Sequence, residues 1–323
     1  MKIEKIVSTT IPDSEKKTVA KKIELDNFKS NLDFFSDFNL VEKTKKDLEI
    51  IELWEREINF LFKELFLDKK FYISPDEVFF IDDQEVFEGD NYLGFFNSIN
   101  DGIMVNTSVF GAAKYKSLLH EMIHLASYRA AYIEKEVFEL RGGGKGEQYQ
   151  QIVTRLGYDI DGSKFDWFNE AITEKITHEI FETKINFLIK NKYIHKENIN
   201  SYLLNSYEYE QKYVDIIIDN VAKKLKIDRG SFWNDIKRGI FSGELMHLRK
   251  IEKVYGNNFL KFMSEITFLF EKSDWSEEEL LKVFKLTNGE EREKYIKNIF
   301  SKKKNSDEKY KDYLIRLKTI YQK

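Results

Sequence analysis

The chain has 323 residues, enough for one large domain or two smaller ones with a substantial hydrophobic core. Hydrophobic residues make up 42% and charged residues 33%, a balance typical of a folded globular protein. The formal net charge of −4 argues against a nucleic-acid partner, which usually needs a basic surface. The absence of cysteine excludes disulfides, thiolate metal ligands and a cysteine nucleophile.

The N-terminal segment lacks the apolar core of a signal peptide, and no run of about 18 apolar residues occurs in the sequence. We therefore expect no signal peptide and no integral membrane segment. The expected location is cytoplasmic, with non-classical export as the open alternative.

Helical patterns fill much of the chain, which has only two prolines. Residues 16–38 are predicted to be helical, and so are residues 43–67, where apolar side chains recur at helical spacing. The first of the predicted regions is therefore an N-terminal helical segment over residues 1–70.

The pattern then changes to short runs of β-branched and aromatic residues, which predict strands at residues 77–82, 92–97 and 102–106. An Asn-Asp-Gly sequence at residues 100–102 is a turn signal between the last two. We expect a small sheet that contains a hairpin.

A helix is predicted over residues 112–140, ended by the glycine-rich residues 141–146. These glycines lack the spacing of a phosphate-binding loop, so a flexible loop is the better interpretation. Residues 147–166 are predicted to be a connecting segment, and residues 167–190 a second helix. Beyond residue 190, helical stretches alternate with short breaks.

Two of the five histidines lie in the pattern His120-Glu121-Met122-Ile123-His124. On a helix, residues i and i+4 share one face, so both imidazoles can bind one metal ion at about 2.0–2.1 Å. Glu121 lies about 100° around the helix and can take a proton from a metal-bound water without being a ligand. Ordinary helix histidines are the weaker interpretation, because burying two histidines and a carboxylate is costly without a partner such as a metal.

A catalytic zinc site needs a third protein ligand, which must be His or a carboxylate because cysteine is absent. The best candidate is Glu170, near the start of the predicted helix over residues 167–190. Glu174 lies four residues later on the same face, where it could accept a hydrogen bond from a ligand imidazole. Taken alone, this pair of glutamates could also be a solvated helix face.

Together, the two motifs resemble those of the gluzincin, or thermolysin-like, zinc metallopeptidases. In that family a helix with His-Glu-x-x-His is followed by a helix whose Glu ligand often stands in an Asn-Glu-x-x-Thr/Ser-Glu/Asp setting. Residues 169–174, Asn-Glu-Ala-Ile-Thr-Glu, match that setting closely. The resemblance covers roughly residues 77–185, and the interval before Glu170 is nearer to that of some bacterial toxin proteases.

The fold implied by the resemblance is α+β. It consists of a zincin-like catalytic core over residues 71–190, with a small mixed sheet and an active-site helix, and a mainly helical C-terminal lobe over residues 191–323. The strand at residues 102–106 would form the upper edge of the cleft, where an extended peptide could pair with its exposed edge.

The activity implied by the resemblance is hydrolysis of a peptide or protein substrate. Zn²⁺ would be bound by His120, His124 and Glu170, and Glu121 would activate the zinc-bound water. Family members usually add a Tyr or His that donates to the oxyanion. The candidates are Tyr158, Tyr207, Tyr209 and His178, of which Tyr207 is preferred because a buried tyrosine hydroxyl near a polar site needs a partner.

Three alternatives stay open at this point. The chain could be a non-peptidase metal hydrolase that uses the same helix pair, a non-catalytic binding module that retains a zincin-like fold, or a helical interaction protein with an accidental motif. Metal content would separate the last from the others. Hydrolysis of a mixed peptide library would separate a peptidase from a non-peptidase.

Overall fold

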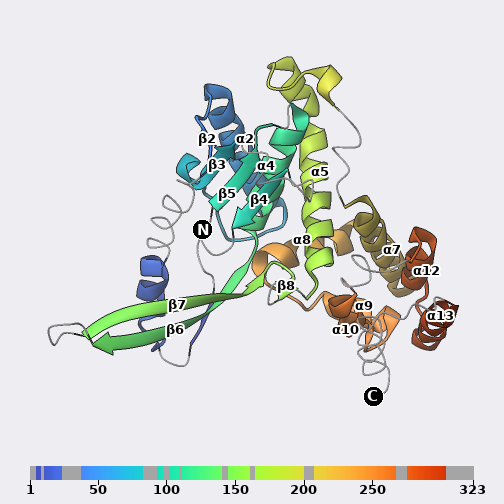
Figure 1. Ribbon diagram of the computed structural model, residues 1–323. Helices are drawn as coiled ribbons and strands as arrows, with labels where there is room; N and C mark the ends of the chain where they lie inside the picture. Colours follow the sequence, from blue (N-terminus) through green and yellow to red (C-terminus); the bar gives the residue numbers. More distant parts are fainter. Residues whose placement is uncertain are drawn as a thin grey trace. The chain divides into compact units, whose positions relative to one another are not determined.

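The computed structural model describes residues 5–8, 11–23, 38–82, 93–97, 102–108, 111–139, 145–160, 164–199, 207–266 and 275–302 (Figure 1). The chain divides into two compact units. Unit 1 comprises Met1–Gly157 and Thr173–Ser206, and unit 2 comprises Tyr158–Ile172 and Tyr207–Lys323. Helices and small sheets occur together, so the α+β class is confirmed.

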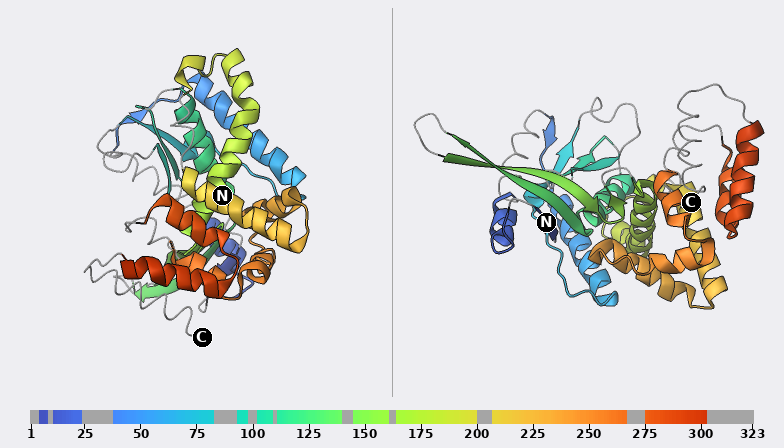
Figure 2. Two further views of the ribbon diagram at one scale, coloured as in Figure 1. Left: turned by 90° about the vertical axis from the view of Figure 1, so that its right-hand side faces the viewer. Right: turned by 90° about the horizontal axis from the view of Figure 1, so that it is seen from below.

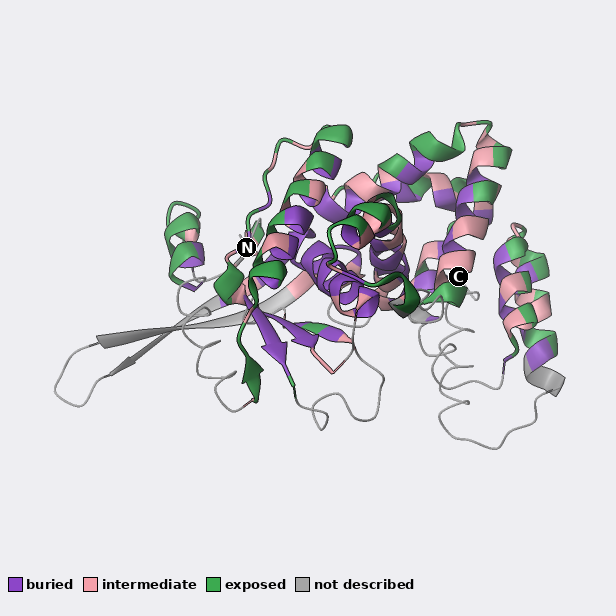
Figure 3. Cartoon of the chain, turned by 90° about the horizontal axis from the view of Figure 1, so that it is seen from above, coloured by how far each residue is buried: buried purple, intermediate pink, exposed green. Residues whose placement is uncertain are grey.

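Unit 1 contains a four-stranded sheet in the order β2-β3-β5-β4. The strands are β2 (Leu40–Val41), β3 (Val78–Ile81), β4 (Gly94–Asn97) and β5 (Gly102–Asn106). β3 and β5 are parallel, and β2 and β4 run antiparallel to their neighbours. Every residue of β3 and β5 is buried and both residues of β2 are exposed (Figure 3), so the middle of the sheet is covered on both faces.

The position of β5 corrects one expectation. Residues 102–106 were expected to offer an exposed edge, but β5 lies between β3 and β4. In the described part of the chain, β4 is the strand at that end of the sheet, and it pairs only with β5. The predicted hairpin is confirmed as an antiparallel pair, while its turn lies outside the described residues.

Two helices pack on each other in unit 1, α2 (Lys45–Glu64) and α4 (Ala112–Ala126). α2 begins at a capping box in which Thr44 and Asp47 satisfy each other's backbone N–H groups. Its apolar face is buried, and the indole of Trp54 donates to the carbonyl of Tyr115 on α4 at 3.1 Å. α4 also packs against β4 and β5, which explains why nearly all of its residues are buried.

The helix predicted over residues 112–140 is too long, because α4 ends at Ala126. The backbone N–H of Ser127 donates to the carbonyl of His124 at 3.1 Å, and its hydroxyl donates to Ile123 at 2.8 Å. The ammonium of Lys69 donates to the carbonyl of Ala126 at 3.0 Å. These donors satisfy carbonyls that a continued helix would have bonded.

A second sheet follows α4, in place of the predicted end of the helix and the predicted connecting segment. Its strands are β1 (Lys5–Val7), β6 (Arg129–Glu139), β7 (Lys145–Leu156) and β8 (Asp159–Ile160), in the order β1-β6-β7-β8. β6 and β7 pair antiparallel along their length (Figure 2), and β1 is parallel to β6. Residues 141–144 of the predicted glycine-rich loop lie outside the described residues.

The units divide the chain differently from the predicted regions 1–70, 71–190 and 191–323. In the N-terminal region β1 pairs with β6, β2 pairs with β3, and α2 packs on α4, so the described residues before 70 are integral to unit 1. Residues 16–23 are helical, and residues 24–37 of the predicted helix lie outside the described residues.

Helix α5 (Asp166–Lys190) confirms the predicted helix over residues 167–190. The helices after residue 207 are α7 (Glu208–Leu225), α8 (Arg229–Ser242), α9 (Leu248–Tyr255), α10 (Phe259–Glu265), α12 (Glu277–Lys285) and α13 (Gly289–Lys302). Short 3₁₀ helices occupy Pro75–Glu77 and Lys196–Asn198. Within the described residues, no helix is both long enough and apolar enough to span a membrane.

Candidate metal centre

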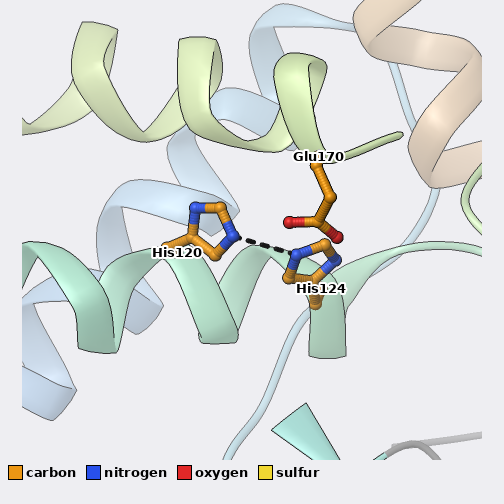
Figure 4. Close-up of side chains that lie close together, drawn as sticks. All are labelled: His120, His124 and Glu170. Carbon is orange, nitrogen blue, oxygen red and sulfur yellow. Dashed lines mark hydrogen bonds between the residues drawn. The ribbon is translucent and has the colours of Figure 1, made fainter. Parts of the chain in front are cut away.

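The two motif histidines lie one helical turn apart on α4 and face the same point (Figure 4). Only 8% of His120 and 5% of His124 is exposed. Their Nε2 atoms are 3.0 Å apart, and the rings meet edge to face with centroids 4.8 Å apart. Because α4 is packed against α2 and the sheet, the helix holds both imidazoles in a fixed, largely dry position.

Helix α5 brings a carboxylate to the same point. Glu170 lies in its first turns, above the histidine rings (Figure 4). The ligand atoms of His120, His124 and Glu170 all lie within 4.8 Å of one another. Among the described residues, this is the group of His and acidic side chains that is arranged to hold a metal ion.

The residue before Glu170 fixes the start of this helix. Asn169 is 2% exposed, and its side-chain oxygen accepts a hydrogen bond from the backbone N–H of Tyr158 at 2.9 Å. Phe168 and Ala171, on either side of the Asn-Glu pair, are fully buried. The asparagine therefore anchors the chain where it enters α5, which explains its place in the motif.

Glu174, one turn after Glu170, contacts a ligand histidine directly. Its Oε2 is 2.9 Å from Nδ1 of His120, and its Oε1 forms a buried ion pair with Lys116. In the neutral imidazole that binds a metal, an Nδ1–H that donates to this carboxylate would leave the lone pair on Nε2, the atom that faces His124. Burial alone would raise the pKa of Glu174, but the hydrogen bond from His120 and the charges of His120 and Lys116 lower it below its ordinary value.

The donor set and its spacing fit zinc. Two imidazoles and one carboxylate are a ligand set of catalytic zinc sites, which keep a fourth position open. Tetrahedral zinc with bonds of about 2.0–2.1 Å would separate two ligand nitrogens by roughly 3.3 Å. The observed 3.0 Å between the Nε2 atoms is close to that separation.

Glu121 follows His120 on α4 and lies next to the sheet. It is 8% exposed, and a β-carbon added at Gly94 of β4 would be only 3.2 Å from its Cγ. The carboxylate is therefore on the side of α4 that faces the terminal strand of the sheet. Its neighbours leave it room because position 94 has no side chain.

The tyrosine candidates for an oxyanion donor differ in burial. Tyr207 is the N-cap residue of α7, in the left-handed backbone region, with 37% of its surface exposed. Tyr209 is 49% exposed on α7. Tyr158 is buried, its hydroxyl donates to the carbonyl of Ile236 at 2.9 Å, and it contacts His247. The assignment of Tyr207 stays a prediction.

Sequence reasoning missed Lys116, which is 3% exposed although lysine is rarely buried. It lies one turn before His120, so Lys116, His120 and His124 occupy positions i, i+4 and i+8 of one helix face. That spacing was a signal available in the sequence.

Comparison of the chain with protein-family profiles, with characterised proteins and with solved structures gave no significant match.

Proposed function

We propose that this protein is a zinc-dependent metallopeptidase of the gluzincin type, with a zincin-like core. The observation that supports it most directly is the grouping of His120, His124 and Glu170 on helices α4 and α5. A helix with both histidines packs against a small mixed sheet, as the family resemblance implies.

Glu121 is proposed as the general base. A bound zinc ion supplies a coordinated water of lowered pKa and polarises the carbonyl group of the substrate. Glu121 would take a proton from the attacking water and pass it to the leaving amine of the cleaved peptide bond. Its place next to His120 on α4, on the side that faces β4, supports this role, and the ligand positions are left to His120, His124 and Glu170.

The substrate is proposed to be an extended peptide that pairs with β4 rather than with β5. Among the described residues, β4 has a neighbouring strand on one side only, so the other side can accept main-chain hydrogen bonds from a peptide. Gly94 contacts the α4 helix at Glu121, which places this strand next to the base. A peptide bound along β4 would lie near the carboxylate of Glu121.

The first test is the zinc content of the purified protein and of a His120→Ala, His124→Ala double variant after dialysis. The parent is expected to hold about one zinc per chain, as a three-ligand site does, and the double variant to hold none. A parent that binds no supplied zinc would overturn the proposal and leave a helical binding protein as the better interpretation.

The second test separates an enzyme from a metal-binding module. Digestion of a mixed peptide library is followed by mass spectrometry, with Glu121→Gln as the matched variant. Loss of the base is expected to lower the rate by about 10²–10⁴-fold while the zinc content is unchanged. A zinc-loaded parent that cleaves no peptide would favour the non-catalytic alternative or a non-peptidase hydrolase.

A further inference from the structure

Lys116 is one of the least expected features of the metal-binding helix. Its side chain is 4% exposed, and the side chain of its partner Glu174 is 2% exposed. Burying a lysine removes its ammonium from water, at a cost that only close partners can offset. The position of this lysine, one turn before a metal ligand, points to a role in the site.

The contacts of Glu174 link Lys116 to the ligand. One carboxylate oxygen, Oε1, accepts a hydrogen bond from the ammonium of Lys116. The other, Oε2, lies 2.9 Å from Nδ1 of His120. The two donors come from the same face of α4, four residues apart, while the acceptor comes from α5. Glu174 therefore spans both donors with its two oxygens.

We propose that Lys116 is a positioning residue of the metal centre, which acts through Glu174 and rests on the function proposed above. By holding Oε1, Lys116 prevents the carboxylate from rotating about its terminal bonds. Oε2 then stays on Nδ1 of His120, and the imidazole keeps Nε2 directed at the metal position. Partners of this kind orient metal-bound histidines and affect affinity without touching the metal.

The same helix contains a matched control. Lys114, two residues earlier, also pairs with a largely buried carboxylate, Asp47, at 2.7 Å. That pair ties α4 to the start of α2 and does not include a metal ligand. If Lys116 were only a structural lysine, replacing it would affect folding stability as replacing Lys114 does, and would leave zinc affinity unchanged.

The experiment compares zinc dissociation constants, measured by competition with a chromophoric chelator, for the parent, Lys116→Met, Lys114→Met, Glu174→Gln and the Lys116→Met, Glu174→Gln double variant. Lys116→Met is expected to weaken zinc binding about tenfold, the lower end of the range for such partners. Lys114→Met is expected to bind zinc as the parent does. In the Glu174→Gln background, Lys116→Met is expected to have no further effect, because its influence passes through Glu174.

Lys116→Gln is measured in parallel, since it keeps a polar group in the same position if the methionine variant does not fold. It is also expected to weaken zinc binding about tenfold, because its shorter side chain cannot hold Oε1. A folded variant at position 116 with the zinc affinity of the parent would overturn the inference. The inference would also be overturned if the losses of zinc affinity caused by Lys116→Met and by Glu174→Gln multiplied in the double variant. A parent that binds no zinc would instead overturn the proposed function itself, so the two failures are distinguishable.

Discussion

Helix α4 contributes to two lysine–carboxylate pairs, each with a buried carboxylate, that are alike in chemistry and differ in the other contacts of the carboxylate. Lys114 pairs with Asp47, whose Oδ2 accepts hydrogen bonds from the backbone N–H of Thr44 at 2.9 Å and from its hydroxyl at 2.7 Å. Lys116 pairs with Glu174, whose other oxygen bonds His120. The Asp47 network therefore ends at the cap of α2, and the Glu174 network ends at the imidazole of His120, which faces the metal position.

Both networks contain the same kind of ion pair. They differ in what the other carboxylate oxygen contacts, which is Thr44 for Asp47 and His120 for Glu174. The Asp47 network is anchored entirely in the scaffold. Its Oδ1 also accepts from the hydroxyl of Tyr115 at 3.1 Å, and the ammonium of Lys114 lies 4.2 Å from the ring centroid of Phe80 on β3. It therefore joins α2, α4 and the sheet.

The largest expected effect comes from removing Asp47. Asp47→Ala is expected to lower the free energy of unfolding by about 3–5 kcal/mol, because the partly buried ammonium of Lys114 and the hydroxyl of Tyr115 lose their partner and α2 loses its capping box. The measurement is urea unfolding of the zinc-free protein, followed by circular dichroism. Zinc affinity of the folded fraction should match that of the parent. A variant that lost zinc affinity as Glu174→Gln is expected to do would erase the distinction between the two networks.

The pH dependence of stability gives a second, smaller effect on the same network. Burial would raise the pKa of Asp47, but the hydrogen bonds from Lys114 and Thr44 lower it below its ordinary value of 3.8. A carboxyl whose pKa is lower in the folded state stabilises the protein above its unfolded pKa and loses that contribution as the pH falls through the folded value.

Asp47→Asn removes this titration. The parent is expected to be more stable than the variant by about 1–3 kcal/mol at neutral pH, the range for hydrogen bonds to a charged group. In urea unfolding, the difference in free energy of unfolding between the two proteins should stay constant from pH 7 to about pH 4 and narrow from there to pH 3. A difference that widens as the pH falls would contradict the lowered pKa.

Much of the scaffold was predictable because its elements follow local rules. The apolar spacing of residues 43–67 predicted α2, and the β-branched and aromatic runs predicted β3, β4 and β5. The end of α4 was not predictable in this way. Residues 127–140 lack Gly and Pro, and the extended conformation of β6 depends on pairing with β7, which is a non-local contact.

The order of the sheet depended on tertiary structure in the same way. β3 and β5 are adjacent and parallel although β4 comes between them in the chain, so the strand at the terminal position could not be deduced from the hairpin alone. Glu170 was predicted to lie near the histidines from the helical spacing of both motifs and from the length of chain between the two helices. The role of Lys116 required knowledge of the face of α5 that it meets.

The smallest of the expected effects concerns the third neighbour of α4, strand β4. A β-carbon at Gly94 would lie 2.4 Å from Oγ of Ser117, 3.1 Å from the carbonyl oxygen of Met104 and 3.2 Å from Cγ of Glu121. The serine side chain can rotate away, but the carbonyl belongs to the backbone of β5. Gly94→Ala is therefore expected to displace either β4 or Glu121, the proposed base.

Because that displacement affects the base and the peptide-binding strand but not the ligands, Gly94→Ala is expected to lower kcat/KM about tenfold, equivalent to about 1.4 kcal/mol, with zinc affinity unchanged. Peptide hydrolysis and chelator competition are measured on the same preparation. Ser117→Ala, which removes the nearest obstructing atom, should not restore activity in the double variant, because the backbone carbonyl and Glu121 still meet the added methyl group. Full recovery would mean that the serine, rather than the distance between β4 and Glu121, accounts for the loss. An equal loss of zinc affinity would place β4 in the metal centre, as a third network beside those of the two lysines.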